Sequence, residues 1–145
     1  MSQARARQAI EIKLMAWATA RPIRVANFEQ GFEAGAEETY LRAFQLPAGT
    51  TCRYLGSDAY EYTGVYQVSI VCPAGQPLAT AESLVGELSS LFRVDSELSR
   101  NGFEGLVTEP VDQGPTIPES ATYTVPASFT YSGVADQPTL QEQSP

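Results

Sequence analysis

The apolar residues of the segment Tyr60–Val71 do not follow a single parity. Four of them fall on both faces of an extended chain: Val65, Val68, Ile70 and Val71. Since successive side chains of a strand point to opposite faces, both faces of this strand are expected to find cover. The pattern therefore predicts a central strand, which the Pro-Ala-Gly turn at residues 73–75 ends.

The 3.6-residue period of an amphipathic helix covers Gln3–Ala20. Pro22 ends this helix, because the residue before a proline avoids the helical region. A second helix follows Pro77, with Thr80 as its expected cap and an end near Val94. The apolar stripes of the two helices are Ala6, Ile10, Leu14 and Trp17, and Leu84, Leu88 and Leu91. Gly86 costs the second helix about 1 kcal/mol relative to alanine, and we expect close approach to the sheet to explain it.

Three strands in a row are predicted before the second helix. Thr39–Leu46 alternates, and Pro47–Gly49 follows as a turn. Thr51–Leu55 is the next strand, and a turn at Gly56–Asp58 leads to the central strand. Short turns between consecutive strands indicate an antiparallel meander.

The strands after the second helix are less continuous. Asp95–Gly102 and Val111–Ser120 are predicted as loops, with a short strand at Phe103–Thr108 between them. The last strand alternates cleanly, with Tyr123, Val125, Ala127, Phe129 and Tyr131 on one face. Pro126 lies within it, which favours an edge position or a bulge because proline has no N–H.

This order of elements predicts an α+β fold, in which two main helices pack on a mainly antiparallel sheet of about four to five strands. The chain is expected to form one domain over residues 1–133, with a mobile C-terminal tail at residues 134–145. Neither a membrane span nor a signal peptide is predicted, so we expect synthesis in the cytosol. The two cysteines, Cys52 and Cys72, are therefore expected to stay reduced and unbridged.

Charge is unevenly distributed. The formal net charge is −8 overall, which argues against a basic nucleic-acid-binding face. The first 24 residues carry five bases and one acid, whereas the segment Asn27–Glu38 carries four glutamates. A basic element that docks on an acidic neighbour explains this polarity, and a solvated helix face explains it equally well.

Residues with obvious catalytic chemistry are scarce. The chain has no histidine, and its two cysteines lack metal-ligand spacing. No phosphate-binding glycine motif or nucleophile elbow is present. An enzyme or ligand-binding domain that uses Cys72 or the glutamate cluster is the alternative left open, but no metal, cofactor or catalytic residue is predicted.

The central run GVYQVSIVCPAGQP, followed by a helix that ends in Phe, resembles the tail terminator proteins of long-tailed bacteriophages, the lambda gpU-like group. The segments RPIRVAN, TYLRAFQLPAG and TYTVPASFTYSG agree with the same family in order and spacing. The resemblance covers Ala9–Gly133 and lies in structural motifs, so the family provides no catalytic residues to transfer.

This resemblance implies a structural virion protein in the neck region of the tail, assembled in the host cytoplasm. Such subunits form a homohexameric ring that ends polymerisation of the tail tube and joins it to the head connector or stopper protein. DNA passes through the lumen without specific binding, and an acidic protein suits that passage because like charge repels phosphate. Another neck protein, a connector or a stopper, is the nearest alternative.

A ring of identical subunits needs two different patches that meet. The candidates on the basic side are Arg5, Arg7, Lys13 and Arg24, and on the acidic side Glu29, Glu33 and Glu37. A third candidate combines aromatic rings with an arginine, as interface centres often do: Tyr40, Arg42 and Phe44. These three are equally well explained as half-buried strand residues.

Overall fold

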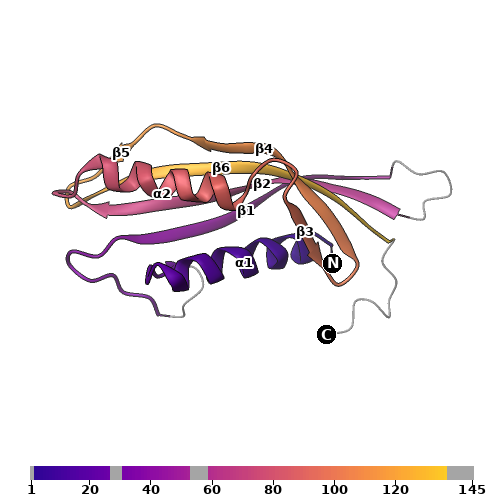
Figure 1. The fold of residues 1–145 in the computed structure, drawn as a ribbon, viewed down its shortest axis with the longest axis horizontal. Helices are drawn as coiled ribbons and strands as arrows, with labels where there is room; N and C mark the ends of the chain where they lie inside the picture. The colour runs from indigo at the N-terminus through magenta and orange to yellow at the C-terminus, as the bar shows by residue number, and fades with distance from the viewer. Residues whose placement is uncertain (1, 27–30, 53–58, 137–145) are drawn as a thin grey trace.

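The structure is a computed structural model that describes residues 2–26, 31–52 and 59–136. Its helices are α1 (Ser2–Ala20) and α2 (Leu78–Leu91), and they are labelled in Figure 1. The strands are β1 (Tyr40–Thr51), β2 (Ala59–Pro73), β3 (Glu97–Arg100), β4 (Phe103–Gln113), β5 (Ile117–Pro118) and β6 (Thr122–Asp136). The predicted α+β class with two helices on an antiparallel sheet is confirmed.

β2 and β6 form the middle of the sheet. The strand order is β1-β2-β6-β4-β3, with β5 paired to β6, and all these pairs are antiparallel. β2 and β6 have 15 residues each and stay in register from Ala59↔Asp136 to Pro73↔Thr122. The mixed apolar pattern around Ile70 thus correctly indicated a central strand.

β1 is longer than predicted and replaces part of the meander. It continues through the expected turn at Pro47–Gly49, where its register against β2 shifts. Proline is tolerated there because β1 lies at the end of the strand order, where a missing N–H breaks fewer ladder bonds. The two strands predicted on either side of this turn are therefore one strand as far as Thr51. Residues 53–58, which include the predicted turn at Gly56–Asp58, lie outside the described residues.

The strand predicted at Phe103–Thr108 is part of β4, but the two loops predicted on either side of it were partly wrong. Residues 97–100 form β3, which pairs with β4 through a turn at Asn101 and Gly102, whose φ angles are 45° and 92°. β4 continues to Gln113, and β5 lies within the segment expected to be a loop. Sequence reasoning missed β3 because its two-residue turn is short and only Leu98 of its four residues is buried. At the C-terminal end, β6 continues to Asp136, three residues beyond the expected domain boundary.

Pro126 lies in an interior strand, not at an edge. Its carbonyl accepts a hydrogen bond of 2.8 Å from the amide of Gly114, just after β4. The N and O atoms of one strand residue point to the same side, so its missing N–H also faces β4. β4 pairs with β6 only as far as Gln113↔Ala127, and β5 pairs with it from Ile117↔Thr124, so Pro126 faces the gap between these two strands and its missing N–H interrupts no ladder.

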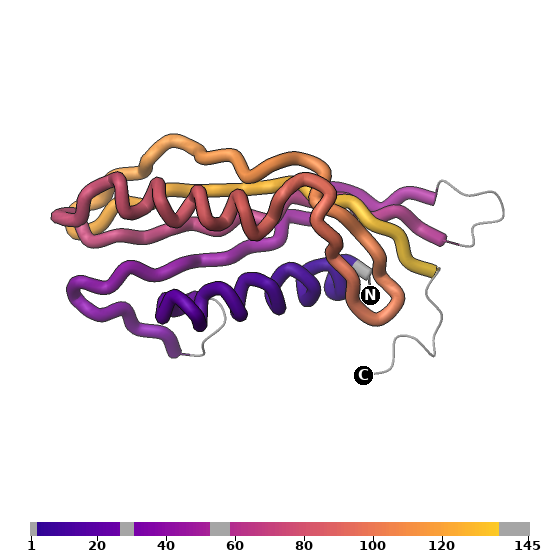
Figure 2. Tube along the Cα trace, in the orientation of Figure 1, coloured from indigo at the N-terminus to yellow at the C-terminus, as the bar shows by residue number. Residues whose placement is uncertain are grey.

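Both helices pack on one face of the sheet. Ile10 and Leu14 of α1 and Leu88 of α2 belong to a single core cluster with the inward-facing strand residues. Phe92, just after α2, stacks on Phe129 of β6 with ring centroids 4.5 Å apart. Figure 2 shows the two helices running along the long strands, with the β3–β4 hairpin bent beside the N-terminal end of α1. Strand residues of the opposite parity therefore point away from the helices.

Two details of α2 differ from expectation. Pro77 is its N-cap residue, without a side-chain cap hydrogen bond, so Thr80 does not cap the helix. Gly86 is exposed, and a Cβ atom there would meet nothing within 4 Å. Its presence is therefore not explained by close packing against the sheet.

Candidate interaction surfaces

The basic residues of α1 mostly have partners inside the subunit. Arg7 donates hydrogen bonds of 3.0 Å to both carboxylate oxygens of Glu11, one turn further along the helix. The Lys13 ammonium lies 5.8 Å from the centre of the Phe92 ring. Arg5 is half-buried, with a guanidinium nitrogen near Gly102. The first turns of α1 are therefore less available for docking on an acidic neighbour than their charge suggested.

Arg24 is held within the subunit by the acidic segment. Its guanidinium donates to both carboxylate oxygens of Glu38 at 2.6 and 2.7 Å and to the Glu33 carbonyl at 2.8 Å. The guanidinium also lies 4.4 Å from the centre of the Phe32 ring. Hydrogen bonds from Arg24, then one from the Gly35 amide, lower the pKa of Glu38 from 4.5 to about 2.

The predicted acidic patch is thus partly engaged within the subunit, because Arg24 binds to it. The side chain of Glu38, which sequence reasoning did not select, makes the ion pair with Arg24. The carboxylates of Glu33 and Glu37 are exposed. Glu29 lies outside the described residues. Structure therefore brings Arg24 close to Glu33, whereas sequence reasoning placed them on two patches that meet between subunits.

The trio Tyr40, Arg42 and Phe44 lies on β1, on the face that points away from the helices. Tyr40 is buried, with its ring centroid 5.1 Å from that of Phe32. Arg42 is exposed and donates a hydrogen bond of 3.3 Å to the Tyr40 hydroxyl. Phe44 is 40% exposed. Arg42 and Phe44 are therefore accessible, whereas Tyr40 supports them from the side.

Two borders of this outward face carry exposed apolar residues. We call Arg42, Phe44 and Leu46 the β1 border. We call Glu97, Glu104 and Leu106 the β3–β4 border, at the other end of the strand order. Sequence reasoning selected neither Leu46 nor Leu106 as a contact residue. Between the borders, the outward residues of β6 include the polar Ser128, Thr130 and Ser132.

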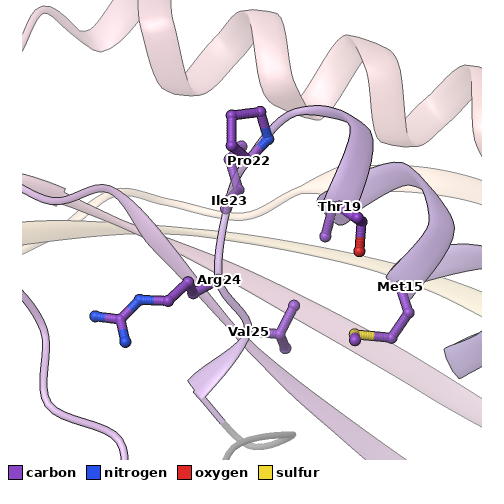
Figure 3. Close-up of a pocket in the computed structure, with 7 residues that line it drawn as sticks. Met15, Thr19, Pro22, Ile23, Arg24 and Val25 are labelled. Atoms are coloured by element: carbon purple, nitrogen blue, oxygen red, sulfur yellow. The ribbon is translucent and has the colours of Figure 1, made fainter.

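A further apolar area lies on α1. Ile12 and Met15 are 54% and 43% exposed. Met15 also lines an open hollow where the chain leaves α1 (Figure 3). The other lining residues are Ala18, Thr19, Pro22, Ile23, Arg24 and Val25. The amide of Leu41 donates a hydrogen bond of 3.0 Å to the Arg24 carbonyl, and Val25 forms an isolated parallel bridge with Leu41 of β1.

The described residues offer little for catalysis. Within them, no group of three or more His, Cys, Asp or Glu side chains is placed to hold a metal ion. Cys72 is buried, and burial raises the pKa of its thiol, so a reactive thiolate is disfavoured. Cys52 is exposed. The β1–β2 register runs from Tyr40↔Val71 to Thr51↔Glu61, so Cys52 and Cys72 lie at opposite ends of this strand pair.

One core, two helices on one face and apolar borders on the other define a small α+β subunit with surface for protein contacts. The chain belongs to the phage tail terminator protein family, whose model matches residues 5–131. A solved structure that is 35% identical in sequence shares the fold with a TM-score of 0.74, over 96% of this chain and 99% of that one. Comparison with curated proteins gave no match.

The family membership gives the chain a structural role in the phage tail, and the virion tail is its location. Neither α1 nor α2 is long and apolar enough to cross a bilayer, as judged over the described residues.

Proposed function

We propose that this chain is the subunit of a homohexameric ring that caps the phage tail tube. The ring ends polymerisation of the tube protein and forms the joint to the head connector or stopper protein. The observation that carries this proposal is the family match, which runs from α1 through most of β6. It is supported by exposed apolar residues on both α1 and the outward sheet face, because a ring subunit needs more than one contact patch.

DNA passes through the lumen of this ring during ejection without being bound specifically. The formal net charge of −8 supports this part of the proposal, since a negatively charged wall repels phosphates. The subunits are made and assembled in the host cytoplasm. The role is structural, with no enzymatic step.

Two measurements test the proposal. Native mass spectrometry of the full chain, alone and on isolated tail tubes, is expected to show six copies at the tube end. Electron microscopy of lysates from phage that lack the chain is expected to show tubes of uncontrolled length without heads. A chain that stays monomeric even on isolated tubes contradicts the proposal.

The neighbouring alternative is another neck protein, a connector or a stopper. Electron microscopy of virions with a label at the C-terminus separates the two. Density at the last layer of the tube supports the terminator, and density one layer closer to the head supports the alternative.

A further inference from the structure

The two borders of the outward sheet face have opposite charge and matching apolar residues. On the β1 border, Arg42 stands beside Phe44 and Leu46, which are 40% and 51% exposed. On the β3–β4 border, two carboxylates flank Leu106, which is 40% exposed. Exposed apolar residues beside an unlike charge are typical of contact surfaces, because the apolar part contributes affinity and the charge fixes orientation.

The charges on both borders are not neutralised by other described residues. Among the described residues, Arg42 forms no ion pair; it donates a hydrogen bond to the Tyr40 hydroxyl and lies 5.7 Å from the centre of the Tyr40 ring. Among the described residues, neither Glu97 nor Glu104 forms an ion pair. Arg7, Arg21 and Arg24, by contrast, each pair with a carboxylate within the subunit. An arginine and two glutamates therefore have their charges available for a partner.

The β3–β4 border also has a shape that can receive a positively charged side chain. Glu97 and Glu104 line a hollow together with Ser99, Gly105 and Leu106. A guanidinium between two carboxylates makes strong, charge-assisted hydrogen bonds, and its planar fork fits carboxylate geometry. The alkyl part of an arginine side chain also packs well on an apolar wall such as Leu106.

One subunit cannot bring its own borders together. They lie at opposite ends of the strand order, and the β3–β4 hairpin is bent toward α1 while β1 continues along the sheet (Figure 1). Two copies of the chain can do so, since each presents one border to the next. A contact between two different patches of identical subunits is heterologous, which is the kind of contact that closes into a ring.

We infer that the β1 border of one copy docks on the β3–β4 border of the next copy. The Arg42 guanidinium enters the hollow between Glu97 and Glu104, while Phe44 and Leu46 cover Leu106. This inference rests on the proposed ring and names the subunit contact within it.

Charge reversal tests the contact directly. Arg42→Glu makes both borders acidic, and the double variant Glu97→Arg/Glu104→Arg makes both basic. Each variant alone is expected to raise the concentration needed for self-association by about tenfold or more. An equimolar mixture of the two charge-reversed variants is expected to restore wild-type association. In a ring where the two variants alternate, every border again meets a border of opposite charge.

The matched control is Glu82→Arg, which reverses an exposed charge on α2 away from both borders. All variants are full-length, and circular dichroism melting confirms that each is folded. Association is measured by sedimentation and native mass spectrometry, with the chain alone and on isolated tail tubes. The control is expected to associate like the wild type.

The outcomes separate this inference from the proposed function. If the wild type forms rings and both border variants do so equally well, the inference is wrong and the ring stands. Rings that form from a border variant but no longer bind tubes show that this border meets the tube protein, which also overturns the inference. A wild type that is monomeric under all conditions, including on tubes, overturns both.

Discussion

The phenol ring of Tyr131 on β6 lies directly over Gly64, its cross-strand partner on β2. A Cβ atom at position 64 would overlap the Tyr131 hydroxyl and the ring carbon that bears it. The hydroxyl donates a hydrogen bond of 2.6 Å to the Gln3 side chain and accepts one of 2.9 Å from Gln45. Gly64 thus gives Tyr131 the room to connect α1 and β1 across the sheet.

Gly64→Ala is expected to destabilise the subunit by about 1 to 3 kcal/mol, the usual cost of forcing extra volume into a packed interior. The added methyl group must displace the buried Tyr131 ring and disturb its hydrogen bonds. Urea unfolding followed by circular dichroism measures the change. An unchanged unfolding midpoint would show that the ring moves aside freely.

Gly86→Ala is the matched substitution with the opposite expectation. Gly86 lies in α2, is exposed, and a Cβ atom there meets nothing within 4 Å. Alanine is favoured over glycine in a helix interior, so the free energy of unfolding is expected to rise by about 0.5 to 1 kcal/mol. The same urea unfolding experiment checks this, and a loss of stability contradicts it.

The Arg24–Glu38 ion pair is expected to make stability depend on acid pH. The pKa of Glu38 is about 2 in the folded subunit, against an ordinary value of 4.5. Its stabilising contribution is therefore fully present above about pH 4.5 and is lost as the pH falls toward 2. Because the pair is partly exposed, the contribution at neutral pH is about 1 kcal/mol or less.

Glu38→Gln checks that expectation. The wild type is expected to be more stable than the variant at pH 6, and the difference in the free energy of unfolding is expected to shrink between pH 4.5 and pH 2. Glu37→Gln, an exposed neighbour, is the control. A difference between wild type and Glu38→Gln that does not vary with pH argues against the ion pair.

The two cysteines are expected to react with a thiol reagent at very different rates. Cys52 is exposed, so it is labelled at once. Cys72 is buried and its thiol pKa is raised, so labelling requires unfolding of the subunit. Mass spectrometry of Cys52→Ser isolates the Cys72 reaction, and rapid labelling of that variant in native buffer favours a reactive thiol at this position.

Local sequence patterns predicted an element correctly where its buried residues recur at the regular spacing of a helix or a strand. The stripe through Ile10 and Leu14 predicted α1, and the alternation from Tyr123 to Tyr131 predicted the inward face of β6 correctly. The mixed parity around Ile70 predicted that β2 is central. These features depend on which faces of an element are buried, and that information is repeated along the sequence at every turn or second residue.

The features that the sequence pattern did not predict depend on which distant segments pair or pack with each other. The sequence around Pro47 reads as a turn, yet β2 holds it in one strand, because an edge position tolerates the missing N–H. Arg24 and Glu33 read as members of two docking patches, whereas the fold brings both to one side of the subunit. The β1 and β3–β4 borders become visible once strand order is known, because Arg42 and Glu104 are far apart in sequence and lie on the same face of the sheet. The sequence determined which residues are buried, and the tertiary structure decided which exposed residues share a surface, since that depends on contacts between distant segments.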